Sequence, residues 1–175
     1  RMATEAIGSF RLSIQAIDRF TPEIAQKVRD IEEKTDHYED VLGTYLARLS
    51  QYQISDRDSA TVSKLLKAIG DLERISDHAV NVIESAEELR EKGIEFSGSA
   101  KAELNVLCRA VEETLTLTER AFGEENVALA YDVEPLEQVV DDLRATLRDS
   151  HIVRLKGGEC TVEAGFIWSD LLTNF

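Results

Sequence analysis

The chain has 175 residues and a formal net charge of −14, from 34 acidic against 20 basic residues. This balance argues against nucleic acid or an anionic lipid surface as a partner, because both are bound by clusters of Lys and Arg. No apolar run reaches the ~18 residues of a membrane span, and Cys108 and Cys160 lack the spacing of a zinc or redox motif. With two prolines and 6% aromatic residues, the composition favours a soluble, all-α protein in a reducing compartment.

The first two predicted helices cover the N-terminal third of the chain. The first runs from Met2 to about Arg19, where apolar residues recur every three or four positions. Thr21 is a suitable N-cap and Pro22 a suitable first residue for the second helix, which is predicted to end near Gln51. Its heptad-like seam comprises Ile24, Val28, Ile31, Thr35, Tyr38, Leu42, Tyr45 and Leu49.

A row of acidic residues follows this seam along the second helix. Glu32, Asp36 and Glu39 lie three or four residues apart, so they share one helix face, and Asp40 extends the group. Carboxylates this close raise one another's pKa unless a counter-charge is present. The row therefore predicts a cation or a basic partner beside the buried edge of the helix.

The third predicted helix carries a second acidic pair. It begins at Ser55 or Asp56, with Ser55 and Asp58 as a capping box, and closes at Lys92–Gly93. Glu73 and Asp77 lie four residues apart beside an apolar stripe. The stripe comprises Val62, Leu65, Leu66, Ile69, Leu72, Ser76, Ala79, Val80 and Ile83.

Two interpretations of these acids follow from their positions. If the second and third helices pack antiparallel through a turn around residues 52–56, both acidic rows face each other and need a metal ion. Oxygen-only ligands suit Mg, Ca, Mn, Fe or Zn. Alternatively, Glu73 and Asp77 are exposed and offset by Lys67 and Arg74. His37 and His78 are interpreted as surface or cap-lining residues, since neither shares the acidic row.

The second half of the chain repeats the pattern of the first. After a linker at residues 94–99, helices are predicted from about Ala100 to Ala121 and from about Glu124 onward. At an offset of 102 residues, identical pairs are Phe20/Phe122, Glu23/Glu125, Asp30/Asp132, Glu32/Glu134, Asp40/Asp142 and Thr44/Thr146. This predicts two copies of a three-helix unit, residues 1–93 and 99–175.

The second copy departs from the first in three places. Gln138 stands where Asp36 would repeat, which leaves a weaker acid set of Glu134, Glu137, Asp141 and Asp142. Residues 154–160, with two adjacent glycines, are predicted to form a basic, glycine-rich loop. The last helix begins near Thr161, and its apolar stripe still continues at Phe175, so we expect this helix to be incomplete.

The run Leu72-Glu-Arg-Ile-Ser-Asp-His-Ala79, in a duplicated helical chain, resembles the PhoU family of phosphate-uptake regulators. The resemblance implies a tandem of two three-helix bundles with antiparallel long helices. It also implies Glu/Asp-x-x-x-Asp motifs that bind metal clusters, most often iron or zinc. Glu73 with Asp77 matches this motif, as does Glu32 with Asp36, whereas Glu134 with Gln138 breaks it.

Residues 36–50 are similar to the PhoU-like domain at the C-terminus of bacterial sodium-dependent phosphate cotransporters. This implies a cytoplasmic regulatory domain at the inner face of the membrane, with a membrane phosphate transporter as partner. The resemblance also leaves open that inorganic phosphate binds through the metal and that the chain forms a homodimer. An enzyme is not expected, because no base or nucleophile is evident. The rival hypothesis is a non-catalytic helical interaction module whose acids are solvated and bind no metal.

Overall fold

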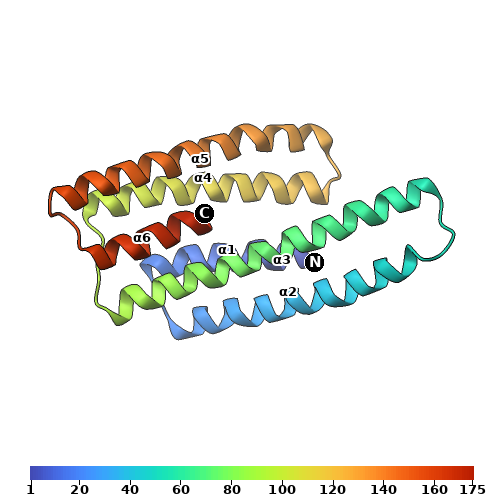
Figure 1. The fold of residues 1–175 in the computed structure, drawn as a ribbon, viewed down its shortest axis with the longest axis horizontal. Helices are drawn as coiled ribbons and strands as arrows, with labels where there is room; N and C mark the ends of the chain where they lie inside the picture. Colours follow the sequence, from blue (N-terminus) through green and yellow to red (C-terminus); the bar gives the residue numbers. More distant parts are fainter.

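The computed structural model describes residues 1–175, which form six α-helices joined by short loops (Figure 1). They are α1 (Met2–Asp18), α2 (Pro22–Leu49), α3 (Asp56–Glu91), α4 (Gly98–Gly123), α5 (Val127–Lys156) and α6 (Val162–Asn174). The all-α prediction is confirmed. No helix is both long enough and apolar enough to cross a membrane.

Side chains at the helix ends explain where the elements begin. Thr21 Oγ1 accepts a hydrogen bond from the Ile24 N–H at 3.2 Å, and Ser55 Oγ accepts one from the Asp58 N–H at 3.2 Å, as the sequence predicts. The fifth helix starts later than expected, since Asn126 caps it. The fourth starts two residues earlier, since Ser97 is its cap.

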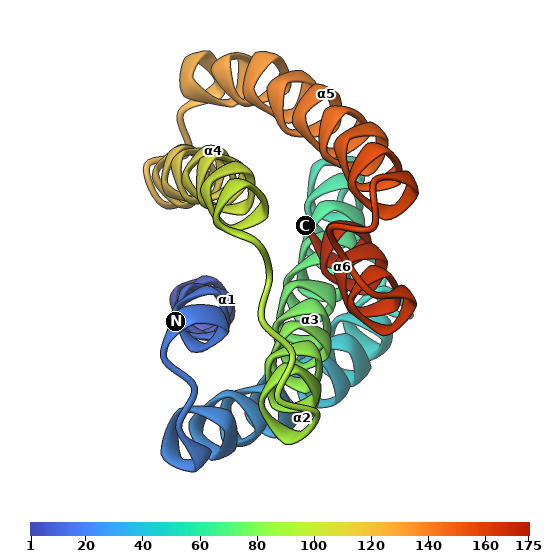
Figure 2. The same ribbon diagram turned by 90° about the vertical axis from the view of Figure 1, so that its left-hand side faces the viewer.

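The long helices pack antiparallel, α2 against α3 and α4 against α5 (Figure 1). The short helix α1 lies against both α2 and α3, and α6 packs against α3 and α5. Seen along the long axis, the helices form an open arc with α4 and α5 at one end and α2 at the other (Figure 2). The division into repeats at residues 1–93 and 99–175 stays a prediction. Its boundary falls within the linker between α3 and α4.

One main hydrophobic core joins all six helices. Its largest fully buried side chain is Trp168 of α6, which is 1% exposed. A second, small cluster comprises Met2, Leu46, Val62 and Ile69. It lies where the start of α1 meets the C-terminal half of α2 and the N-terminal half of α3.

The predicted apolar seam is wrong toward the tip of the α2–α3 hairpin. Leu42 is 40% exposed, Tyr45 61% and Leu65 44%, and Leu66 is also exposed. The hairpin extends beyond the N-terminal end of α1 (Figure 1). Each helix therefore has one neighbour there instead of two, and one neighbour covers a narrower stripe.

The predicted basic loop at residues 154–160 is also corrected. Arg154 lies in the last turn of α5 and is buried, and the loop is confined to residues 157–161. The start of α6 is confirmed, because Thr161 Oγ1 accepts a hydrogen bond from the Ala164 N–H at 3.1 Å. Phe175 packs edge-on against Phe10 of α1, with ring centroids 5.8 Å apart.

Candidate metal centre

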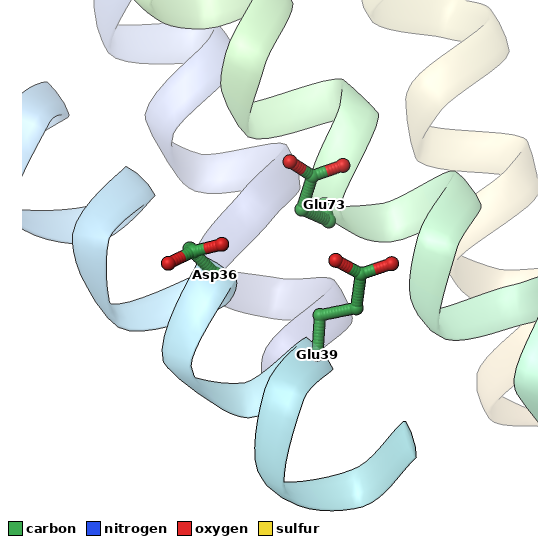
Figure 3. A group of neighbouring side chains, drawn as sticks. All are labelled: Asp36, Glu39 and Glu73. Carbon is green, nitrogen blue, oxygen red and sulfur yellow. The ribbon is translucent and has the colours of Figure 1, made fainter. Parts of the chain in front are cut away.

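Three carboxylates from two helices converge in the first half of the chain. Asp36 and Glu39 of α2 and Glu73 of α3 each offer one oxygen, and these oxygens all lie within 4.8 Å of one another. Figure 3 shows the three carboxylates facing the same space between the helices. The antiparallel packing of α2 and α3 thus brings the two predicted acidic rows together.

Local geometry explains why these particular side chains meet. Asp36 and Glu39 are three residues apart, so they lie on the same face of α2. Gly70 lies three residues before Glu73 on α3, and a β-carbon at this glycine would stand 3.4 Å from Glu39 Oε1. The Glu39 carboxylate therefore lies close against α3 where that helix has no side chain.

The electrostatics of the group show that its negative charge is not compensated. Burial, the charges of Asp77, Glu39 and Asp36, and a hydrogen bond with Asp77 raise the pKa of Glu73 to about 7. Burial and the charges of Asp77, Asp36 and a neighbouring glutamate also raise the pKa of Glu32.

No ion pair relieves this charge. The nearby base Lys34 pairs instead with Glu5 of α1, at 2.6 Å, a contact that the sequence did not predict. None of Glu32, Asp36, Glu39, Glu73 and Asp77 takes part in any salt bridge of the protein.

The donor set fits a metal ion. Oxygen ligands bind Mg²⁺ or Ca²⁺ at about 2.0 to 2.6 Å, so two ligands of one ion are at most about 4 to 5 Å apart. The separations among the Asp36, Glu39 and Glu73 oxygens fall within this limit. All three donors are carboxylates, which hard and borderline cations accept.

The other predicted ligands occupy different positions. Glu32 and Asp77 are not among the three convergent acids. The charge of Asp77 still raises the pKa of Glu73, and the charges of Asp77 and Asp36 raise the pKa of Glu32. Asp40 is exposed and is not part of it. The second-half acids are all exposed on α5 and are not brought together with acids of a facing helix; they are Glu134, Glu137, Asp141 and Asp142.

Two of the second-half acids have local partners instead. Asp141 pairs with Arg144 at 3.3 Å, and Asp142 accepts a hydrogen bond from the Gln138 amide at 3.0 Å. Of the motif histidines, His37 is exposed and His78 bonds to Asn174 of α6 at 2.9 Å. Neither histidine belongs to the convergent group of α2 and α3.

Comparison with known proteins identifies the family. The PhoU domain model matches residues 1–86, the part of the chain that contains the convergent acids. Residues 1–86 are therefore a PhoU domain. A curated relative is the phosphate-specific transport system accessory protein PhoU homolog 1 of Thermotoga maritima. It is 25% identical over 167 residues, which cover 89% of this chain and 67% of the relative. No solved structure matches the chain to a comparable level.

Proposed function

We propose that this chain is a regulatory domain of phosphate uptake in which Asp36, Glu39 and Glu73 bind a metal ion. The observation that carries this proposal is the convergence of the three carboxylates, within 4.8 Å, without a basic partner. In this proposal Glu32 and Asp77 are further ligands if a cluster binds, because the charge of Asp77 raises the pKa of Glu73 and the charge of Asp36 raises the pKa of Glu32. Fe and Zn are the metals implied by the family resemblance, and Mg, Mn and Ca suit the same oxygen donors.

The metal would allow an acidic site to take part in phosphate sensing. Bare carboxylates repel an anion, whereas an ion held by three protein ligands keeps open positions that accept phosphate oxygens. Because the ligands come from both α2 and α3, occupancy would favour one packing of these two helices. The chain's own contribution is binding and transmission, so we propose no catalytic step.

The partner in this proposal is a membrane phosphate transporter, and the domain acts at the cytoplasmic side of the membrane. Support comes from the name of the Thermotoga relative, which is an accessory protein of a phosphate-specific transport system. The more specific proposal, a domain of a sodium-dependent phosphate cotransporter, rests on the resemblance of residues 36–50.

Metal binding is tested by equilibrium dialysis of EDTA-treated protein against Fe²⁺, Zn²⁺ or Mn²⁺, followed by elemental analysis. We expect the double variant Asp36→Asn/Glu73→Gln to lose metal that the wild type retains. The matched control is Glu137→Gln/Asp141→Asn, which removes the same charge from exposed positions on α5.

Equal metal content in the two double variants would contradict the metal centre. The helical interaction module would then be the remaining function. The observation that favours it is the exposed apolar surface near the hairpin tip, where Val41 is 51%, Tyr45 61% and Tyr52 72% exposed.

The regulatory role is tested in cells. Phosphate uptake by cells that express Asp36→Asn/Glu73→Gln should no longer respond to external phosphate, whereas the α5 control should respond normally. A normal response from both variants would separate metal binding from regulation and contradict the proposed role.

A further inference from the structure

A cavity of about 260 Å³ lies where the α3–α4 linker, the end of α5 and the start of α6 meet. The lining residues that matter here are Phe96, Ser97, His151, Arg154, Thr161 and Trp168. Gly93, which also lines the cavity, follows Glu73 by 20 residues, or about 30 Å along a helix. The cavity is therefore remote from the candidate metal centre.

The buried charged group at this cavity is Arg154, which is 7% exposed. Its Nη1 donates a hydrogen bond to Glu103 Oε2 at 2.7 Å, and its guanidinium lies 5.2 Å from the centre of the Trp168 ring. Its Nη2 is enclosed and has no hydrogen-bond partner. A buried guanidinium N–H without an acceptor destabilises the fold, because it has lost its hydrogen bonds to water and has gained none within the protein.

Two helix N-termini reach the same cavity. Ser97 caps α4 and Thr161 caps α6, and each hydroxyl accepts one N–H of its own first turn, from Ala100 and Ala164. All four of these residues line the cavity. The first-turn N–H groups of a helix have no intrahelical acceptor and carry partial positive charge. Both helix ends thus add to the positive potential of Arg154.

The acids nearest the cavity do not cancel this potential from inside. Glu95 and Glu159 also line the cavity, but both are exposed. The Glu95 side chain is 84% exposed and pairs with Lys101 at 3.4 Å. Charges in such positions are screened by water and salt. The enclosed charge at the cavity is that of Arg154, with Glu103 as its one ionic partner.

We propose that this cavity is a second ligand site, for a small oxyanion, either a carboxylate or a phosphate. Its donor is Arg154 Nη2, and the positive ends of α4 and α6 favour the anion electrostatically, since guanidinium groups and helix N-termini both attract such anions. Because Nη2 is covered, the anion reaches it when the loop at residues 157–161 shifts. This loop is mostly exposed and contains Gly158 at φ +72°. The proposal is independent of the metal centre.

The chain provides its own reporter for this site. Trp168 is the single tryptophan of the chain, and it lies against Arg154. Its fluorescence is measured while EDTA-treated protein is titrated with acetate or with sodium phosphate, against sodium chloride at equal ionic strength. We expect a saturable change with at least one oxyanion and none with chloride. Saturation by acetate alone assigns a carboxylate ligand, and saturation by phosphate alone assigns a phosphate.

Two variants test the residues of the site. Arg154→Met keeps an apolar stem over Trp168 and should weaken the oxyanion by roughly tenfold or more, since a charge-assisted donor is lost. Glu103→Gln keeps Arg154 and removes its competing carboxylate, so it should tighten binding. Glu103 has a side chain that is 30% exposed, which makes this second variant compatible with folding.

Three results would overturn the proposal. The first is the absence of any saturable change with either oxyanion. The second is a binding constant that Glu103→Gln and Arg154→Met both leave unchanged. The third is loss of the signal in Asp36→Asn/Glu73→Gln, which would assign the anion to the metal centre. Failure of metal binding in dialysis leaves this titration unaffected, so the two proposals fail separately.

Discussion

Replacing Glu73 by Gln probes the charge conflict at the candidate metal centre directly. In metal-free protein, burial and the neighbouring acids raise the pKa of Glu73 from 4.5 to about 7. The folded state thus holds this proton more tightly than the unfolded state. The resulting stabilisation is complete below the unfolded pKa and is lost as the pH rises through about 7. A shift of about 2.5 pKa units corresponds to roughly 3 kcal/mol, and solvent screening at a partly exposed side chain reduces it to about 1 to 2 kcal/mol.

The expected effect of Glu73→Gln has opposite signs without and with metal. In EDTA at pH 8, the variant should be more stable than the wild type by about 1 to 2 kcal/mol, or roughly 2 to 8 °C in Tm for a chain of this size. With metal at about 100 times its Kd, the wild type should gain about 2.7 kcal/mol, and the variant should gain much less. The variant is then the less stable protein.

The assay is urea unfolding followed by circular dichroism, at pH 5 and pH 8, with EDTA and then with metal. The control is Asp40→Asn, which removes the same charge from an exposed neighbour on α2. It corrects for the general repulsion in a chain of net charge −14. If Glu73→Gln is no more stable than Asp40→Asn in EDTA at pH 8, the reasoning about the convergent carboxylates is refuted.

Three further predictions concern the rest of the fold. Gly165→Ala would place a β-carbon 2.7 Å from His151 Nε2, and we expect it to lower the free energy of unfolding by about 1 to 2 kcal/mol in thermal melts. Gly43→Ala meets no atom within 4 Å and should raise the free energy of unfolding by up to about 1 kcal/mol. Equal effects of the two variants would contradict this packing. Leu107→Ala, at a fully buried position of α4, should cost about 2 to 5 kcal/mol in urea unfolding, against about 0.5 kcal/mol or less for its exposed neighbour Val106→Ala. Burial and the Arg154 guanidinium lower the pKa of His151, so the stability of the fold should decrease as the pH drops below 6.5, the ordinary pKa of histidine. His151→Gln should therefore flatten the pH dependence of Tm between pH 7 and 5. An unchanged slope would show that this histidine does not cause the pH dependence.

Helix identity and the ends of the first three helices were predictable because their causes are local. Thr21 with Pro22, Ser55 with Asp58, and Gly93 at φ +61° are signals that occupy a few adjacent residues. The meeting of the two acidic rows followed from the same kind of reasoning. Rows on one face of each helix and a short turn leave few ways to pack α2 on α3. Metal binding itself stays a prediction.

The exposed residues near the hairpin tip were not predictable from periodicity. Leu42 and Tyr45 continue the apolar spacing of α2, but burial depends on whether α1 reaches them. The length of α1 relative to the hairpin is a property of the assembled fold. The seam therefore predicts which face of α2 is apolar. How far along α2 that face is covered depends on the length of α1.

The buried Arg154 was missed for a different reason. Its partners, Glu103 and Trp168, come from α4 and α6, so no local pattern identifies them. One signal was present in the sequence. Val140, Leu147 and Arg154 are spaced by seven residues, and all three are buried on α5. Extending the apolar spacing through the charged residue would have placed Arg154 inside the protein.

The two hydrophobic clusters divide the α2–α3 hairpin into parts of unequal resistance to opening. The part nearer the linker is held by six helices, and the part nearer the tip is held by four buried side chains. Amide protons near the tip should consequently exchange with deuterium well before those around Ala79 and Val82. Asp36, Glu39 and Glu73 lie between the two parts along both helices. An ion bound there would link α2 to α3. Its binding or release would change the flexibility of the part near the tip, while the part near the linker stays rigid.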